Sequence, residues 1–240
     1  ARDGLGALFN SNTCISCHIR NGGGRVFDKN NNISTSLIAK ISINSNGSKK
    51  HKQFLKYNGF VPHNIYGSQI STQAIYGIDF EAKLKVEYKD KIFTYKDGKQ
   101  VVLQEPLQGI KHQLQDLRYG NIASNTIISN RIAPALVGLG LLEQLSDEQI
   151  LANEDIEDIN NDGISGKANI VYSPIHKSFK VGRYSRKASS FSVIHQVASA
   201  SNNDMGLSNP IFQNENCTIK QKECLNAPKG IDKFDLPMNR

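Results

Sequence analysis

The feature that most constrains this chain is a short motif near its N-terminus, Cys14-Ile15-Ser16-Cys17-His18. With 4 cysteines and 6 histidines among 240 residues, the pattern is expected by chance about 0.002 times, so it is not accidental. Cysteines three residues apart on a helical turn project to the same side, where they can form thioethers with the two vinyl groups of one porphyrin. The motif therefore predicts covalent haem c, attached at Cys14 and Cys17, with His18 as the proximal iron ligand.

Two other uses of the motif stay open on the residues alone. A structural zinc site needs four ligands, usually from two knuckles of similar spacing, whereas Cys217 and Cys224 lie seven residues apart. A thioredoxin-like redox pair needs a strand before the motif and a helix after it. Here we expect a helix before the motif and a glycine loop after it, so both alternatives are less favoured than haem.

The positive charge of the chain is dispersed rather than concentrated. Its 29 lysines and arginines are scattered among 22 aspartates and glutamates, for a formal net charge of +7. Nucleic-acid binding would gather basic residues on one element or interleave them with stacking aromatics, and neither pattern is visible. We therefore expect a redox partner protein with an acidic surface, and no nucleic-acid partner.

The cellular location is indicated by the cysteines and by the haem motif. Apolar runs fall short of the ~18 to 20 residues of a membrane span, and the first residues lack the pattern of a secretory signal. The four cysteines form two pairs in sequence, which suits an oxidising compartment. We expect a periplasmic or extracellular protein in its mature form, with no membrane span.

Most of the regular structure is predicted to be helical. Apolar periodicity predicts helices over residues 2–18, 131–145 and 190–200. The second of these contains a proline near its start, which the first turn of a helix tolerates. Ser146 and Gln149 have the spacing of a capping box, which predicts a further short helix.

Strands are predicted in two places. Residues 37–43 alternate well enough for a strand, and residues 82–103 predict a meander of three short strands with a tight turn. We therefore expect a mainly α, cytochrome c-like haem domain with a small β meander insertion and long irregular loops. The expected division is 1–36 for the first part of the haem domain, 37–121 for the β-containing insertion and 122–240 for the remainder.

The sixth iron ligand decides between peroxide chemistry and simple electron transfer. The chain has only two methionines, and Met205, in the segment NNDMGLSNP, is the leading candidate for the distal position. The alternative role for this methionine is to fill a gap in the core. His195 is a weaker candidate, with a hydrogen-bonded interior histidine as its alternative role.

One loop resembles the first half of a calcium-binding loop. Asp158, Asn160 and Asp162 place oxygen-bearing side chains at alternate positions before Gly163. Asn169 stands where an EF-hand would have its closing glutamate, so an EF-hand is disfavoured. An isolated Ca²⁺ site and an Asx-rich turn satisfied by its own backbone both stay open.

The remaining cysteines and a short basic run complete the candidate sites. The spacing of Cys217 and Cys224 predicts a disulfide that closes a small loop. By the loop-entropy model, this disulfide would stabilise the folded state by about 2–3 kcal/mol. A second candidate group could pair with haem propionates or form an ordinary solvated face: Arg183, Arg186 and Lys187.

Six ordered blocks resemble the di-haem oxidoreductase family. They read GLGALFNSNTCISCHIRNGGGR, RIAPALVGLGLLEQL, DINNDGISGKANIV, GRYSRKAS, NNDMGLSNPIF and ENCTIKQKEC, and they cover residues 4–25 and 131–224. Members of that family are named as peroxidases or thiol oxidoreductases and are related to bacterial di-haem cytochrome c peroxidases. The resemblance implies haem-dependent redox chemistry, and related di-haem peroxidases hold calcium between domains.

The chain departs from the family pattern in one respect. Family members carry a second Cys-x-x-Cys-His downstream, and this chain has none. We expect either that a second haem segment or subunit is missing from this chain or that the protein is a mono-haem relative. Electron transfer is therefore expected of this chain, and peroxidase-like activity of the complete protein. The other functions considered are a haem-bearing assembly module of an electron-conducting complex and a zinc-stabilised binding domain.

Overall fold

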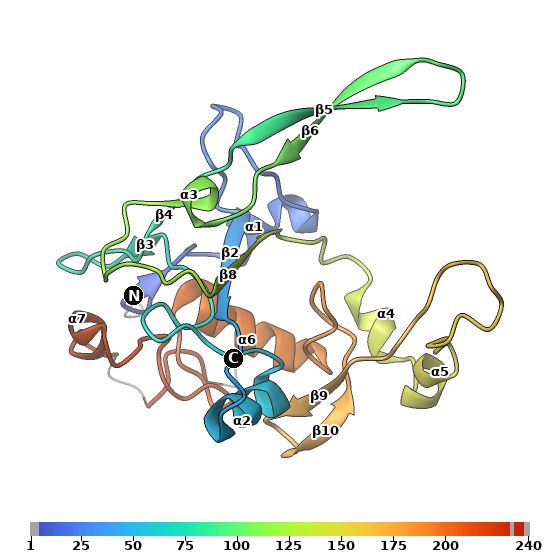
Figure 1. Cartoon of the computed structure of the whole chain (residues 1–240). Helices are drawn as coiled ribbons and strands as arrows, with labels where there is room; N and C mark the ends of the chain where they lie inside the picture. Colours follow the sequence, from blue (N-terminus) through green and yellow to red (C-terminus); the bar gives the residue numbers. More distant parts are fainter. Residues whose placement is uncertain (1–4, 231–232, 238–240) are drawn as a thin grey trace.

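The chain folds into small antiparallel ribbons joined by loops and short helices (Figure 1). The computed structural model describes residues 5–230 and 233–237. Within them, strands pair in five separate two-stranded sheets. The elements in chain order are β1 (Leu8–Phe9), α1 (Cys14–Cys17), the 3-10 turn η1 (Ile19–Asn21), β2 (Leu37–Ile43), α2 (Lys49–Asn58), β3 (Gln73–Ala74), β4 (Lys83–Leu84), β5 (Tyr88–Thr94), β6 (Gln100–Pro106), α3 (Ile110–Gln113), β7 (Leu114–Gln115), β8 (Thr126–Ile132), α4 (Leu139–Glu143), α5 (Asp147–Leu151), β9 (Ile170–Ser173), β10 (Ser178–Val181), α6 (Val193–Met205) and α7 (Lys222–Leu225).

The expected mainly α, cytochrome c-like fold is wrong. The chain is 21% helical and 23% strand, and α6, its longest helix, has 13 residues. Residues 2–4 of the predicted helix over residues 2–18 lie outside the described residues, and from residue 5 on it is replaced by β1, which pairs with β3, and by the single turn α1. The predicted helix over 131–145 is reduced to α4, because β8 continues to Ile132 and Gly138 adopts a left-handed conformation with φ 80°. Local apolar pattern was outweighed there by strand pairing.

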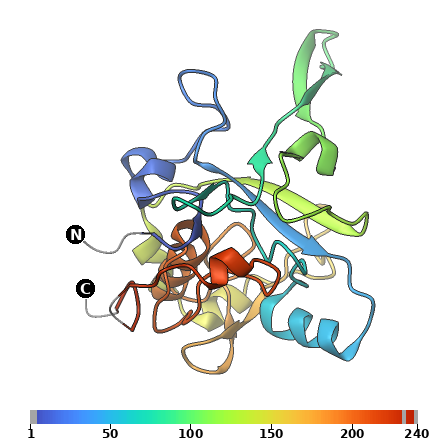
Figure 2. The same cartoon turned by 90° about the vertical axis from the view of Figure 1, so that its left-hand side faces the viewer.

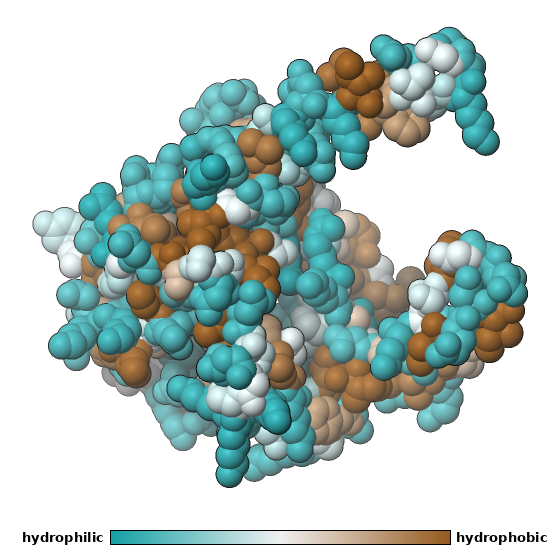
Figure 3. Space-filling view, in the orientation of Figure 1, coloured by the Kyte–Doolittle hydropathy of each residue, from teal (hydrophilic) through white to brown (hydrophobic). Residues whose placement is uncertain are grey.

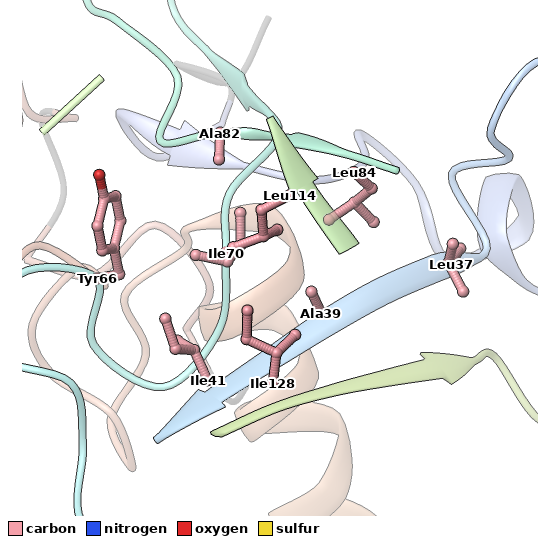
Figure 4. Packing of buried hydrophobic residues seen from close by; sticks show 9 residues of the cluster. All are labelled: Leu37, Ala39, Ile41, Tyr66, Ile70, Ala82, Leu84, Leu114 and Ile128. Carbon is pink, nitrogen blue, oxygen red and sulfur yellow. The ribbon is translucent and has the colours of Figure 1, made fainter. Parts of the chain in front are cut away.

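The β2–β8 ribbon organises the core. The predicted strand over residues 37–43 is confirmed, and it pairs with β8 from Leu37 opposite Ile132 to Ile43 opposite Thr126. Alternate residues of β2 are buried on one face, as a strand with a period of two requires. They pack against side chains from the loops and small strands around them (Figure 4), and the cluster comprises Leu37, Ala39, Ile41, Tyr66, Ile70, Ala82, Leu84, Leu114 and Ile128.

The predicted three-stranded meander is also wrong. The structure contains a two-stranded hairpin, β5–β6, whose tight turn at Gly98 with φ 84° matches the prediction. The third strand, β4, pairs instead with β7. The hairpin stands clear of the body in both views (Figures 1 and 2), and Ile92 and Val102, which face each other across it, are exposed.

Helix α6 is held at both ends. Its N-cap Ser192 accepts a hydrogen bond from the backbone of His195, and Gly206 ends the helix with φ 70°. The N-terminal segment crosses this C-terminal end so closely that a Cβ on Gly6 would lie 2.1 Å from the carbonyl oxygen of Gly206. The crossing therefore requires glycine at this point on both segments, at Gly6 and at Gly206.

A buried carboxyl group links three distant segments. The Glu81 side chain accepts hydrogen bonds from the backbone N–H of Ser71, at 2.5 Å, and from the Gln221 amide. All three residues are almost fully buried. Burial raises the pKa of Glu81 to about 8, so this carboxyl group is neutral in the folded protein at pH 7.

Gly6→Ala tests the crossing. The added methyl group would overlap the Gly206 carbonyl, so we expect a loss of about 1–3 kcal/mol in the free energy of unfolding and a lower Tm. Gly140→Ala is the matched control, because a Cβ at Gly140 in α4 meets nothing within 4 Å. Thermal unfolding followed by circular dichroism makes the comparison, and an unchanged Tm for Gly6→Ala would contradict the close approach.

Glu81→Gln tests the buried carboxyl group. Its pKa is about 8 when folded against a model value of 4.5, so only the folded state holds the proton between these values. The free energy of unfolding should therefore fall as pH rises from 5 to 8, by about 1 kcal/mol per pH unit. Urea unfolding at several pH values should show this slope in the wild type and in the exposed control Glu157→Gln, but not in Glu81→Gln. An unchanged slope in Glu81→Gln would contradict this account.

Candidate haem site

The cysteine motif forms one turn of helix. Thr13 caps α1, because its hydroxyl oxygen accepts a hydrogen bond from the backbone N–H of Ser16. The backbone N–H of His18 donates to the carbonyl of Cys14 at 2.9 Å. Cys14 is exposed, Cys17 is half-buried, and neither is in a disulfide. Two thiols at positions i and i+3 of a turn lie on the same side of it, as attachment to one porphyrin requires.

The imidazole of His18 is oriented by a distant carbonyl group. Its Nδ1 lies 2.6 Å from the backbone oxygen of Pro134, which is 116 residues away in sequence. A carbonyl oxygen can only accept, so Nδ1 carries the proton and donates it. The lone pair of the ring then lies on Nε2, the nitrogen that remains for a metal.

The segment that supplies this carbonyl is itself fixed. Ala133 accepts a hydrogen bond from Gly24 N–H at 2.8 Å and donates one to the carbonyl of Ser36 at 2.9 Å. Leu136 N–H donates to the carbonyl of Asn21 at 2.9 Å. The residues that follow β8 are therefore bonded along the loop after the motif, and Pro134 has little freedom to move.

Cys17 is held as a neutral thiol. Its sulfur lies 3.0 Å from the carbonyl oxygen of Thr35, and its own carbonyl accepts a hydrogen bond from the Ser36 hydroxyl at 2.7 Å. Burial raises the pKa of the Cys17 thiol, and the negative charge of Asp204 raises it further. Reactive redox cysteines have lowered pKa values, so this environment does not favour the thioredoxin-like alternative.

The C-terminal end of helix α6 is bonded to the segment that precedes the motif. The carbonyl of Met205 accepts a hydrogen bond from Gly6 N–H at 3.0 Å, and the carbonyl of Asp204 accepts from Asn10 and Ser11 N–H at 2.8 and 3.1 Å. These donors belong to the segment that leads directly into α1. Met205, half-buried at the end of the helix, therefore lies at the end of α6 nearest the motif.

His195 lies at the other end of α6. Ten residues separate it from Met205, or about 15 Å along the helix axis. It is buried between aromatic rings, with centroids 5.5 Å from Phe191 and 6.0 Å from Phe212. Its Nδ1 has no hydrogen-bond partner among the described residues, and burial lowers its pKa. The structure therefore separates the two candidate distal ligands and sets His195 in an aromatic cluster.

Apolar side chains are exposed on the elements that adjoin the motif. The exposed fraction of the side chain is 64% for Ile15 in α1 and 68% for Leu141 in α4. It is 77% for Val137, which precedes α4. Ile194 and Val197 of α6, which packs against α4, are also exposed. Figure 3 shows hydrophobic residues on the surface of the projection that carries α4 and α5. A large flat apolar group such as a porphyrin could cover part of this surface.

From the sequence, six apolar residues are expected to cover the porphyrin ring, and only some of them are available for it: Leu8, Phe9, Ile132, Leu136, Val137 and Leu139. Leu8 and Phe9 are buried within the protein, and Ile132 packs against the core beside β2. Leu136 and Leu139 are half-buried and Val137 is exposed, so these three remain available.

The calcium-like loop satisfies its own oxygens. The Asp158 carboxylate accepts hydrogen bonds from the backbone of Asp162 and Gly163, at 3.0 and 3.1 Å, and the Asn160 side-chain oxygen accepts another from Asp162. One Asp162 carboxylate oxygen accepts from the backbone of Ile164 at 2.8 Å. This is the bonding of an Asx-rich turn, and it does not support a calcium site.

Cys217 and Cys224 are joined as a disulfide with a Cα–Cα distance of 5.8 Å. With Glu215 they form the one group of metal-ligand side chains found within the described ranges. Two sulfurs bonded to each other cannot serve as thiolate ligands. This group therefore does not supply a zinc site.

Several residues of the site carry little sequence signal. Pro134 acts through its backbone carbonyl, and Thr35 likewise, so no side-chain pattern marks either of them. Asp204 could be found only through the contact of α6 with the N-terminal segment. Lys40 did leave a signal, because it is a lone lysine within the apolar strand LIAKISI.

No helix among residues 5–230 and 233–237 is long and apolar enough to cross a membrane. The chain has no significant match to a curated protein or to a solved structure. A family model described as "Di-haem oxidoreductase, putative peroxidase" matches residues 1–223. This description implies a haem cofactor and a redox role for members of the family. The chain therefore belongs to the di-haem oxidoreductase family.

Proposed function

We propose that this chain binds one haem c through thioethers to Cys14 and Cys17, with His18 as proximal ligand, and passes electrons to and from a partner protein. The hydrogen bond between His18 Nδ1 and the Pro134 carbonyl is the observation that carries this proposal. It selects Nε2 as the metal-binding nitrogen and sets the plane of the ring. When bound, the haem supplies a one-electron ferric–ferrous couple.

Met205 is the proposed distal ligand. Its position at the end of α6, fixed through its own carbonyl by Gly6, supports this assignment over His195. A thioether in the sixth position fills the site and favours electron transfer over peroxide chemistry. Peroxide reduction is accordingly proposed for the complete protein, in which a second haem segment or subunit would complement this chain.

The proposed location is periplasmic or extracellular. The Cys217–Cys224 disulfide and the motif for covalent haem both suit an oxidising compartment. The proposed partner is a redox protein with an acidic surface, because the net charge of this chain is +7.

The haem assignment is tested with three variants made in cells that mature c-type cytochromes. We expect Cys14→Ala or Cys17→Ala to leave one thioether and weak haem retention, and His18→Ala to remove the proximal ligand. Intact mass counts the attached haem, and the pyridine haemochrome spectrum reports the number of thioethers. His176→Ala is the matched control, because His176 is an exposed residue between β9 and β10 and its loss should not affect the spectrum.

The assignment fails if wild-type protein carries no covalent haem. It also fails if the His18→Ala variant keeps the low-spin c-type spectrum of the wild type. Retention of full haem content by both cysteine variants would likewise contradict attachment through this motif.

Met205→Leu tests the distal ligand. Leucine fills a similar volume but offers no sulfur, so we expect ferric haem to become high-spin and to lose the weak long-wavelength band of thioether ligation. His195→Gln is the matched variant and should keep that band. If Met205→Leu stays low-spin while His195→Gln becomes high-spin, the ligand is His195 and the assignment to Met205 is wrong.

A further inference from the structure

Three cations lie together beside the motif without a carboxylate in ion-pair contact. Lys40 belongs to β2, Arg131 to β8, and Arg186 to the loop after β10. Within residues 5–230 and 233–237, ion pairs involve other lysines and arginines, and none involves these three. Lys40 and Arg131 are half-buried. Arg186 is exposed. Charges removed from water are costly unless an opposite charge is near, so an anion beside Lys40 and Arg131 would stabilise the cluster.

The strand register places two of the cations on one face. Ile38 lies opposite Arg131, and Lys40 lies opposite Ser129. Lys40 and Arg131 are therefore diagonal neighbours, about 7–8 Å apart, on the face turned away from the Ala39 side of the ribbon. Burial lowers the pKa values of both groups, and the neighbouring positive charge lowers each further.

Arg186 joins this face through a backbone carbonyl. Its Nε and one Nη donate to the carbonyl oxygen of Ile132, at 3.1 and 3.0 Å. A guanidinium has five N–H donors, so three remain for another acceptor. Ile132 is the neighbour of Arg131 and precedes Pro134, the acceptor of His18, by two residues. One end of the cluster thus lies next to the segment whose Pro134 carbonyl binds the ring of His18, the proposed proximal ligand.

The other end of the cluster adjoins the segment that leads into the motif. Lys40 pairs with Gln69 in an antiparallel bridge, and the Asp204 carbonyl accepts a hydrogen bond from Ser11 N–H at 3.1 Å. The charge of Asp204 raises the pKa of Lys40 against the effect of burial. Asp204 does not neutralise the cluster, because it is one carboxylate against three cations and its Oδ1 accepts from the Gln69 amide at 2.7 Å.

We propose that Lys40, Arg131 and Arg186 bind the propionate groups of the haem, an inference that rests on the proposed function of this chain. A porphyrin attached at the motif brings two carboxylates into a site where charge-assisted hydrogen bonds are strong. Arg183 takes no part, because it donates to the carbonyls of Leu142 and Leu145 and pairs with Asp147. The haem would thus supply the anions that the cluster lacks.

The test uses haem-loaded protein and measures the midpoint potential against pH. Cations beside the propionates keep them ionised, so the wild-type potential should be constant from pH 5 to 8. In Arg131→Met and Lys40→Met, we expect a lower potential, because loss of positive charge favours ferric iron, and a dependence on pH as the propionates take up protons. Arg131→Lys keeps the charge and should restore the flat profile.

Lys167→Met is the control for charge alone, because Lys167 is exposed and lies outside the basic run of Arg183, Arg186 and Lys187. It should change the potential slightly and leave the profile flat. A flat profile in haem-loaded Arg131→Met and Lys40→Met would overturn this inference and leave the haem assignment intact. Absence of covalent haem from the wild type would overturn both.

Discussion

The hydrogen bond between the His18 ring and the Pro134 carbonyl is the contact around which the site is arranged. It joins segments 116 residues apart, and the pairing of β2 with β8 carries residues 133–136 alongside the motif loop. The core under that ribbon and the orientation of the imidazole are therefore coupled. A change that shifted the register of β8 by one residue would also turn the ring.

The second constraint is the close crossing of two backbones at Gly6 and Gly206. Because of this crossing, three N–H groups of the segment before the motif donate hydrogen bonds to the last carbonyls of α6. The last carbonyls of a helix have no partners within the helix itself. The helix end and the motif are thereby positioned by the same few bonds. The proposed proximal and distal ligands, His18 and Met205, are thus positioned by connected hydrogen bonds, although they lie far apart in sequence.

Some local elements of this protein were predictable from the sequence, but others and their assembly were not. The strand over residues 37–43 and the capping box at Ser146 and Gln149 are present as expected, because the alternation of apolar residues and the spacing of the cap are local signals that the distant contacts do not oppose. The helices over 2–18 and 131–145 were predicted wrongly, because Leu8 and Ile132 pair with strands distant in sequence. The cysteine motif could be recognised in the sequence because its chemistry lies in its side chains. The role of Pro134 could not, because it acts through a backbone carbonyl that every residue has. Lys40 could have been noticed as a charge in an apolar strand.

The β5–β6 hairpin is joined to the body at two points that face each other, since Tyr88 lies opposite Pro106 in the register. Because entry and exit are adjacent strands, residue pairs can be added or removed beyond this junction without changing the path of the chain elsewhere. The arm is therefore a part of the molecule whose length can drift during evolution at little structural cost. Relatives that share the haem motif and the β2–β8 ribbon can be expected to differ most in how far this arm extends.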